Sequence, residues 1–422
     1  MSPYLELRPA QFLVSFVLLC ATGGAGPASA SDFELHPSLA VSEEFNDNIF
    51  NTASDRRSDF VTRIRPGVAL LYRTPDFNAD LSYNFEYRDY ARDSRGKEQT
   101  HTLALHSGAE LLENFLFVEL TDTLSRVSLD VARDVTSESL FVNQTDQNRA
   151  VFSPYLLWRL SEKSALKTGY RYTDTRYWGV DGGGGGINRQ EHSVFADLSH
   201  EYSSRLTLSA GYAFSRVDTD IADYDHQDIS AGASYLFAEN SVIFGGIGNS
   251  WQRYSDSHSV SDPFWNAGIK KDFGLLVATA ETKVAYIDDP LTVSTKETSY
   301  RVGLEKPLQH GSAGLSGSYS KYAATRLGES GRRKTALAGF WRYDLSERLA
   351  ATVVATGDKV SRDGIDDDYP YHFSGSAGVS YGFNYDITTT LTYTYVEYRH
   401  DWDSSADAKQ TNRVVLEARK VF

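Results

Sequence analysis

Along most of the chain, apolar and polar residues alternate one by one, and this period of two limits the possible folds more than any other feature. Between residues 77 and 87 every odd position is apolar and every even position is polar. The same alternation returns in residues 206–214, 373–383 and 387–395. Successive side chains of a β-strand point to opposite faces. These segments therefore predict strands with one apolar face and one polar face.

The connections between these strands distinguish a membrane barrel from a soluble β-sandwich, in which apolar faces form a core. Outer-membrane barrels have short periplasmic turns and longer outer loops. Short turns are expected at residues 73–76, 161–164, 203–204, 238–240 and 384–386. Longer polar loops are expected around residues 92–97, 130–147, 179–190, 218–226, 357–368 and 400–410. The alternation of short and long connections favours the barrel.

The aromatic residues and the end of the chain support the same fold. Tyr72 and Phe77 flank a short turn on the apolar face, where a ring sits well between lipid and water. The last strand ends at Phe422, and Val414 and Leu416 share its apolar face. A terminal strand of this kind resembles the recognition signal of the barrel-assembly machinery. We therefore expect Phe422, Leu416 and Val414 to act as the assembly signal.

These observations predict an all-β fold, a transmembrane antiparallel up-and-down β-barrel. The pattern gives about twenty strands, within a range of roughly 18–22, each of about ten residues or more. Such a barrel belongs to the outer membrane of a Gram-negative bacterium, in contact with its lipid and lipopolysaccharide. An even number of strands places both termini on the periplasmic side. No second domain and no plug is evident in the pattern.

The first thirty residues differ from the rest and predict a signal peptide. Arg8 precedes an apolar run at residues 12–21, and residues 28–30 (ASA) form a small-residue cleavage site. We therefore assign residues 1–30 to the signal peptide and residues 31–422 to the barrel. Cys20 is the only cysteine and lies in the expected signal. The mature chain would then contain no disulfide.

Composition and motifs exclude several functional classes. The chain has 42 Lys+Arg against 56 Asp+Glu, a net charge of -14, so there is no basic excess for a nucleic-acid partner. Sequence motifs of metalloproteases, serine hydrolases and nucleotide-binding loops are absent, and we expect neither an enzyme nor a cofactor. The acidic residues 366–368 and 401–407 match no recognised calcium loop, so we interpret them as solvated loop charge rather than a metal site.

The start of the mature chain resembles a known family. Residues 42–50 (SEEFNDNIF) and 58–67 (SDFVTRIRPG) look like the opening of the β-barrel porin type 2 proteins. That family includes outer-membrane proteins encoded beside exopolysaccharide and exosortase systems. The resemblance covers residues 37–90 and implies a barrel and a link to envelope polysaccharide. It carries over no catalytic residue.

The polar faces of the strands are expected to line the lumen, because an arginine facing lipid near the midplane costs about 2–4 kcal/mol. The arginines with this parity on strands near the two ends of the chain are Arg63, Arg65, Arg88, Arg413 and Arg419. We expect them to form a lumen-facing basic patch that binds anionic groups. Alternatively, they pair with the neighbouring Glu86 and Glu417 and brace the wall.

The strand number sets the expected function. Side chains cannot fill the interior of a barrel of about twenty strands, since lumen diameter grows with strand number. We therefore expect a water-filled conduit, and the family resemblance links it to the export of an extracellular polysaccharide. Two alternatives stay open: a general porin for small solutes, and a non-conducting structural or adhesive barrel of the envelope.

Overall fold

The computed structural model describes residues 31–133, 144–179, 185–256, 258–324, 331–363 and 369–422. The first ten strands are β1 Asp32–Asn46, β2 Asp59–Arg73, β3 Phe77–Tyr90, β4 Glu98–Leu112, β5 Leu116–Ser128, β6 Gln144–Ser161, β7 Ser164–Gly179, β8 Arg189–Ser203, β9 Leu206–Thr219 and β10 Tyr224–Ala238. The others are β11 Ser241–Tyr254, β12 Ser259–Asp272, β13 Val277–Ile287, β14 Thr295–Leu308, β15 Gly311–Ala324, β16 Arg332–Ser346, β17 Leu349–Arg362, β18 Tyr371–Gly382, β19 Ile387–Arg399 and β20 Lys409–Val421.

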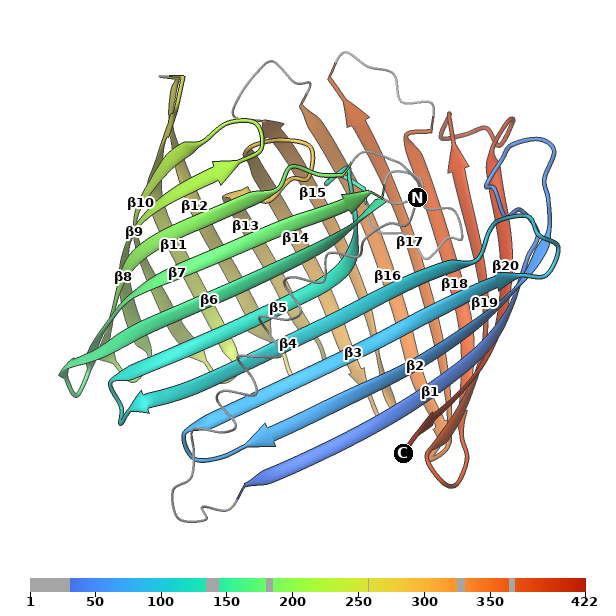
Figure 1. The fold of residues 1–422 in the computed structure, drawn as a ribbon, viewed down its shortest axis with the longest axis horizontal. Helices are drawn as coiled ribbons and strands as arrows, with labels where there is room; N and C mark the ends of the chain where they lie inside the picture. The colour runs from blue at the N-terminus through green and yellow to red at the C-terminus, as the bar shows by residue number, and fades with distance from the viewer. Residues whose placement is uncertain (1–30, 134–143, 180–184, 257, 325–330, 364–368) are drawn as a thin grey trace, which may run out of the picture.

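In the described part of the chain, these twenty strands form one closed antiparallel sheet (Figure 1). Each strand pairs with the strands before and after it in the sequence, and β1 closes the ring by pairing with β20. The structure confirms the predicted all-β antiparallel up-and-down barrel. Among the described residues, no helix is long and apolar enough to span a membrane.

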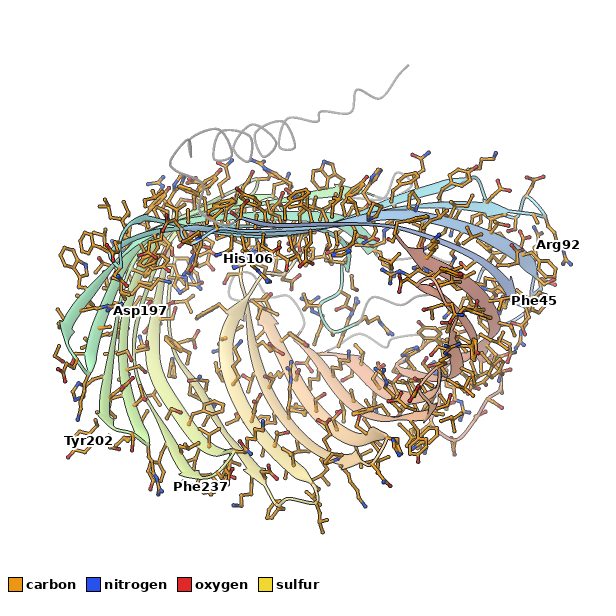
Figure 2. The ribbon with its side chains drawn as sticks, turned by 90° about the horizontal axis from the view of Figure 1, so that it is seen from below. Phe45, Arg92, His106, Asp197, Tyr202 and Phe237 are labelled. Atoms are coloured by element: carbon orange, nitrogen blue, oxygen red, sulfur yellow. The ribbon has the colours of Figure 1, made fainter. Side chains whose placement is uncertain are left out.

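The two faces of the wall follow the alternation of the sequence. On β1 the side chains of Leu39, Val41 and Phe45 are exposed on the outside, whereas those of Ser42 and Glu44 are buried on the inside. Figure 2 shows the same division elsewhere, with Tyr202 outside and His106 and Asp197 inside. An apolar exterior around a polar interior suits a wall that faces lipid outside and water inside.

Among the described residues, the backbone pairing between two sets of neighbouring strands ends before it reaches the end of the barrel with the long loops. We call the line of pairing between two neighbouring strands a seam. The pairing of β4 with β5 ends at Leu103–Leu124, and the pairing of β12 with β13 ends at Trp265–Val284. Figure 1 shows β4 and β5 diverging towards this end. Beyond these pairs, β5 and β13 lean into the barrel while they stay paired with β6 and β14. The segments that follow them therefore enter the lumen.

The connections agree with the predicted alternation, with one important omission. The short turns lie where they were expected, but the predicted loop at 218–226 is reduced to residues 220–223, and the first six residues of the predicted loop at 357–368 belong to β17. The segment 288–294 between β13 and β14 was not predicted as a loop, and it proves to cross the lumen. Parts of other predicted features lie outside the described residues: the signal peptide at 1–30, the glycine-rich segment at 180–184 and the acidic residues 366–368.

Candidate functional site

The segment after β5 reaches across the lumen to the far wall. Asp130 accepts a hydrogen bond from the backbone N–H of Ala132 at 3.0 Å, which closes a tight turn. Its carboxylate then binds two arginines of the inner wall, Arg332 on β16 at 3.1 Å and Arg362 on β17 at 2.7 Å. Arg133 adds a hydrogen bond to the carbonyl oxygen of Tyr369 at 3.2 Å. This segment is thus anchored to the wall opposite its own strand.

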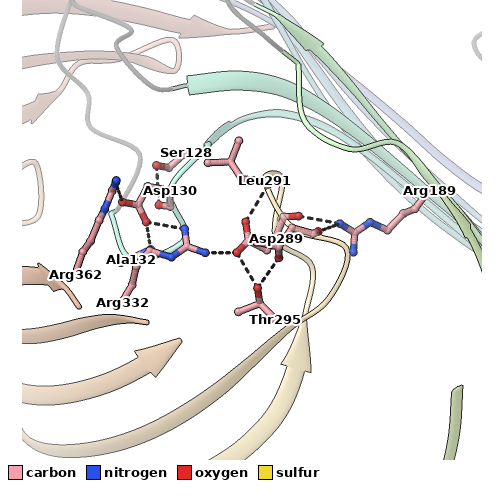
Figure 3. Close-up of polar contacts among 10 residues, drawn as sticks. Ser128, Asp130, Ala132, Arg189, Asp289, Leu291, Thr295, Arg332 and Arg362 are labelled. Atoms are coloured by element: carbon pink, nitrogen blue, oxygen red, sulfur yellow. Dashed lines mark hydrogen bonds and ion pairs between the residues drawn. The ribbon is translucent and has the colours of Figure 1, made fainter. Parts of the chain in front are cut away.

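The segment between β13 and β14 meets the same arginine from the other side. Asp289 forms an ion pair with Arg332, so that one guanidinium joins the two inward segments. The Asp289 carboxylate also accepts hydrogen bonds from the N–H of Leu291 at 3.0 Å and the hydroxyl of Thr295 at 2.8 Å. The Asp289 side chain is fully buried, and these donors compensate its negative charge in the absence of water. Arg332 is therefore the central residue of the arrangement (Figure 3).

The network continues to β8. Arg189 pairs with Asp288 at 2.9 Å and donates to the carbonyl oxygens of Asp289 at 2.8 Å and Thr292 at 3.3 Å. Asp288 also lies 3.5 Å from Arg149 of β6. Alternating charges thus run from β17 through the lumen to β8. We name the set Arg362, Asp130, Arg332, Asp289, Arg189, Asp288 and Arg149 the mouth network.

The electrostatics of Asp130 favour the inward position of its loop. Burial alone would raise the pKa of the Asp130 carboxyl. The hydrogen bond from Ala132 and the guanidinium groups of Arg362 and Arg332 outweigh burial, so this pKa lies below its ordinary value. The carboxylate is therefore charged across the neutral range, which keeps its ion pairs intact.

Apolar contacts hold the same segments against the wall. Ala132 packs against Tyr322 and Val360, together with Val131 and Ile287. A second cluster combines residues of the wall, of neighbouring loops and of the inward segment: Ile187, Val217, Ala222, Tyr224, Tyr254 and Val293. Both clusters lie at the end of the barrel with the long loops. The lumen is thus bridged at the end with the long loops by packed and ion-paired chain.

Sequence reasoning missed the mouth network, although a signal for it exists. Val217, Tyr224, Tyr254, Tyr322 and Val360 have the parity of the lumen face but are apolar and buried. A water-filled lumen would place polar residues there. Buried apolar residues of lumen parity that cluster at the long-loop ends of several strands are a signal that chain packs inside.

The five arginines of the predicted basic patch lie on the inner face of three strands, β2, β3 and β20, around β1. Arg63 pairs with the fully buried Glu44, and Arg88 with Glu86. Arg65 pairs with Glu417 and lies 3.7 Å from Glu86. Carboxylates thus interleave with the arginines. The binding of anionic groups by this patch stays a prediction.

Exposure divides the patch into two groups. The side chains of Arg63 and Arg88 are 13% and 12% exposed, and Arg413 is buried. The Arg65 side chain is 36% exposed, and Arg419 is exposed to the lumen. A passing solute would therefore meet Arg65 and Arg419 first, whereas the other three lie within the ion-paired wall.

The three residues of the predicted assembly signal lie on the outer face of β20. Val414 and Leu416 are exposed opposite Phe45 and Glu43 of β1. The backbone N–H of Phe422 donates to the carbonyl oxygen of Pro37 at 2.8 Å, so the last residue extends the closing seam. Its ring is exposed, with the Lys420 ammonium 4.6 Å from its centroid. Their role in assembly stays a prediction.

Within the described ranges, no group of three or more His, Cys, Asp or Glu is placed to hold a metal ion. Tyr369 and Lys409 form a cation–π contact of 3.9 Å beside the predicted acidic loop at 401–407. The Asp407 carbonyl oxygen accepts a hydrogen bond from the Tyr369 hydroxyl at 3.3 Å. This end of the loop is thus fixed by ordinary polar contacts.

No family model matches the sequence, and no curated protein is similar to it at the sequence level. The resemblance of residues 37–90 to the porin type 2 family therefore stays a prediction.

Solved structures share the fold. The FrpB iron transporter of Neisseria meningitidis (F3-3 variant) has a TM-score of 0.54 at 10% identity, over 92% of this chain and 81% of that one. A mutant of the ferric enterobactin receptor PfeA of Pseudomonas aeruginosa gives 0.54 at 10%, over 92% and 80%. The ferric-catecholate import receptor Fiu of E. coli K12 gives 0.53 at 10%, over 94% and 82%. The chain therefore has the fold of an outer-membrane β-barrel.

Proposed function

We propose that this protein is a conduit for hydrophilic solutes whose outer mouth is held closed by two inward segments. The observation that carries the proposal is the mouth network, which joins these segments to each other and to the wall through Arg332. A barrel with a polar inner face provides the path, and a buried set of ion pairs provides a barrier that can be released. The transporters with a similar fold support a transport role in general.

The pH dependence of conductance tests this proposal. Asp130 has a lowered pKa in the closed mouth, so its contribution to closure is complete above the ordinary aspartate pKa of 3.8 and is lost as pH falls through the lowered value. We expect the refolded protein in a planar bilayer to conduct weakly near neutral pH and more strongly below about pH 3.8. Asp130→Asn should remove this transition, whereas Asp363→Asn, which affects an exposed ion pair with Arg333, should retain it.

An unchanged pH course in Asp130→Asn would contradict closure through the mouth network. If neither the natural protein nor Asp130→Asn conducts at any pH, the barrel is a non-conducting structural protein, and the conduit proposal fails.

We propose further that the solutes include chains with anionic groups, such as the uronate or phosphate groups of an envelope polysaccharide. The support is the family resemblance of residues 37–90 and the lumen exposure of Arg65 and Arg419. Guanidinium presents a fork of donors to carboxylate or phosphate and keeps its charge at all physiological pH values.

Ion selectivity tests this second proposal. The double variant Arg65→Gln/Arg419→Gln removes the exposed positive charges, so the reversal potential in a salt gradient should shift towards cations. Arg216→Gln is the matched control, because Arg216 is exposed on the outer face of β9. If the double variant and the control give the same reversal potential, the arginines brace the wall and do not guide anions.

A further inference from the structure

The seam between β12 and β13 is open in its outer part. The last pair is Trp265–Val284, and residues 259–264 of β12 have no partner on β13. The Trp265 side chain closes the paired part of the seam on the outer face. Its indole Nε1 donates a hydrogen bond to the hydroxyl of Thr282, two residues before Val284 on β13, at 3.2 Å. In the hydrocarbon region an open strand edge is costly, because backbone groups lose their partners. The loss of backbone pairing between β12 and β13 beyond Trp265 therefore needs a physical explanation.

The sequence itself stops the ladder at this point. In an antiparallel strand, alternate residues bond to the two neighbours. The N–H of Tyr254 donates to the carbonyl oxygen of His258, so even-numbered residues of β12 bond to β11 and odd-numbered ones face β13. After Trp265, the next residue to bond to β13 would be Pro263. Proline has no N–H, so the ladder loses a donor at its first unpaired position.

Side chains close the open part of the seam. The Asp262 carboxylate accepts a hydrogen bond from the hydroxyl of Tyr286 at 3.0 Å and pairs with the Lys296 ammonium at 2.6 Å. Asp262 belongs to β12, whereas Tyr286 and Lys296 belong to β13 and β14. We name these three residues the latch. Side-chain contacts of this kind part more easily than a ladder of backbone hydrogen bonds.

The outer surface beside this seam is apolar and hollowed. A groove of about 920 Å³ runs over the outer face from β7 to β12. Its lining includes Leu198, Tyr212, Ile229, Ile247, Pro263 and Trp265. The groove thus ends at the residues where the seam opens. It is continuous with the apolar band of the barrel, where acyl chains are the surrounding solvent.

The seam between β4 and β5 is also open but has a different outer surface. Its outer face carries Asp122, hydrogen-bonded by Asn148 at 2.6 Å, and Arg126, paired with Asp146 at 2.8 Å. Charged groups at the edge oppose the entry of an acyl chain. The two open seams therefore differ in chemistry: buried charged groups line the edge of β5, whereas Pro263 and Trp265 at the edge of β12 border the apolar groove.

The open part of the β12–β13 seam lies in the outer half of the membrane. Trp265 lies seven residues from Asp272, the end of β12 at the short turn. At a rise of about 3.4 Å per residue this is about 24 Å along the strand, or about 18 Å in height for a tilt of about 40°. The apolar band of such barrels is about 25 Å tall. The gap thus begins among the acyl chains of the outer leaflet, below the mouth network.

We propose that the outer part of the β12–β13 seam is a lateral portal through which an acyl chain of an outer-leaflet amphiphile enters the lumen. The groove guides the chain to Pro263, the missing backbone ladder leaves space for it, and the latch controls its passage. The mouth network blocks the axial path at the same end of the barrel, so the seam offers a sideways path. The portal does not depend on conduction through the mouth.

Quenching by brominated lipid tests the portal. The background is the full chain with Cys20→Ser, and single cysteines carry a fluorophore on the inner face. Asn266→Cys places the label inside the β12–β13 seam, and Thr102→Cys places it inside the β4–β5 seam. In phosphatidylcholine vesicles with brominated acyl chains, we expect the label at residue 266 to be quenched severalfold more strongly than the label at residue 102.

The latch supplies the second arm of this experiment. Asp262→Asn should increase quenching at residue 266, whereas Asp358→Asn, an inner-wall carboxylate of β17 paired with His372 at 2.9 Å, should leave it unchanged. In a protein that carries the fluorophore at residue 266 on a genetically encoded non-thiol side chain, joining Asp262→Cys to Lys296→Cys with a short bifunctional thiol reagent should reduce quenching to the level at residue 102 without changing ion conductance. Equal quenching at the two seams, or quenching that survives the cross-link, would overturn the portal.

Discussion

Arg332→Gln is expected to open the outer mouth at neutral pH. The substitution removes the only charge that joins Asp130 to Asp289 among the described residues, and it leaves Asp289 buried without its cationic partner. Breaking a buried ion pair by removal of one partner costs about 3–5 kcal/mol. About 3 kcal/mol changes the ratio of open to closed mouths by about a hundredfold, since each 1.4 kcal/mol is about tenfold. Single-channel recording should show a large rise in conductance at neutral pH.

Arg333→Gln is the matched control for this experiment. Arg333 follows Arg332 on β16 but points outward, and it pairs with the exposed Asp363 at 2.8 Å. Exposed pairs contribute little, about 0–1 kcal/mol. We therefore expect Arg333→Gln to conduct like the natural protein. Equal conductance of both variants would mean that Arg332 does not hold the mouth closed.

Phe422→Ala is expected to lower the amount of assembled barrel severalfold. The substitution removes the terminal ring but keeps the N–H that donates to Pro37, so the closing seam retains its backbone hydrogen bond. The loss would therefore reflect recognition during assembly rather than closure of the folded barrel. The measurement is the protein level in the outer-membrane fraction, with a gel assay of the folded form.

Phe383→Ala separates the assembly signal from simple loss of an aromatic residue. Phe383 is 52% exposed and Phe422 is 62% exposed, and both lie at the end of the barrel with the short turns. We expect normal levels of Phe383→Ala. If both variants assemble normally, the terminal aromatic residue is not a recognition signal in this protein.

The fold was predictable because its determinants are local and repeated. Residues 77–87 alternate strictly, and they form most of β3 with the predicted faces. A period of two fixes which face each residue occupies, and a slip of one residue would turn every apolar side chain of a strand inward. The inner-face positions of Arg63 and Arg413 follow from the same parity.

The mouth network was not predictable from the same pattern, because its contacts are between distant parts of the chain. Asp130 and Arg332 are 202 residues apart, and neither residue stands in a recognisable motif. The segment 288–294 is short and carries two adjacent carboxylates, which in isolation indicate a solvated loop. Only the closed ring of strands brings these residues together, and only the early end of two seams turns the segments inward.

The early end of the seams also links the two proposals physically. Because β13 leans inward, Asp289 lies close enough to pair with Arg332, and the outer part of β13 lies apart from β12. Closure of the mouth and opening of the side are thus consequences of one displacement of the wall. Release of the mouth network in Arg332→Gln should therefore allow β13 to approach β12, which would weaken quenching of the label at residue 266.

The uptake of neutral sugars tests the central claim most directly. A change in ion current also reflects the altered charge of Arg332→Gln, whereas a neutral solute responds to the width of the path alone. In liposome-swelling experiments with neutral oligosaccharides of increasing size, we expect the natural protein to admit only small sugars slowly. Arg332→Gln should admit them much faster and should accept larger ones, while Arg333→Gln should match the natural protein. Identical rates and identical size limits for all three proteins would contradict a mouth closed by the inward segments.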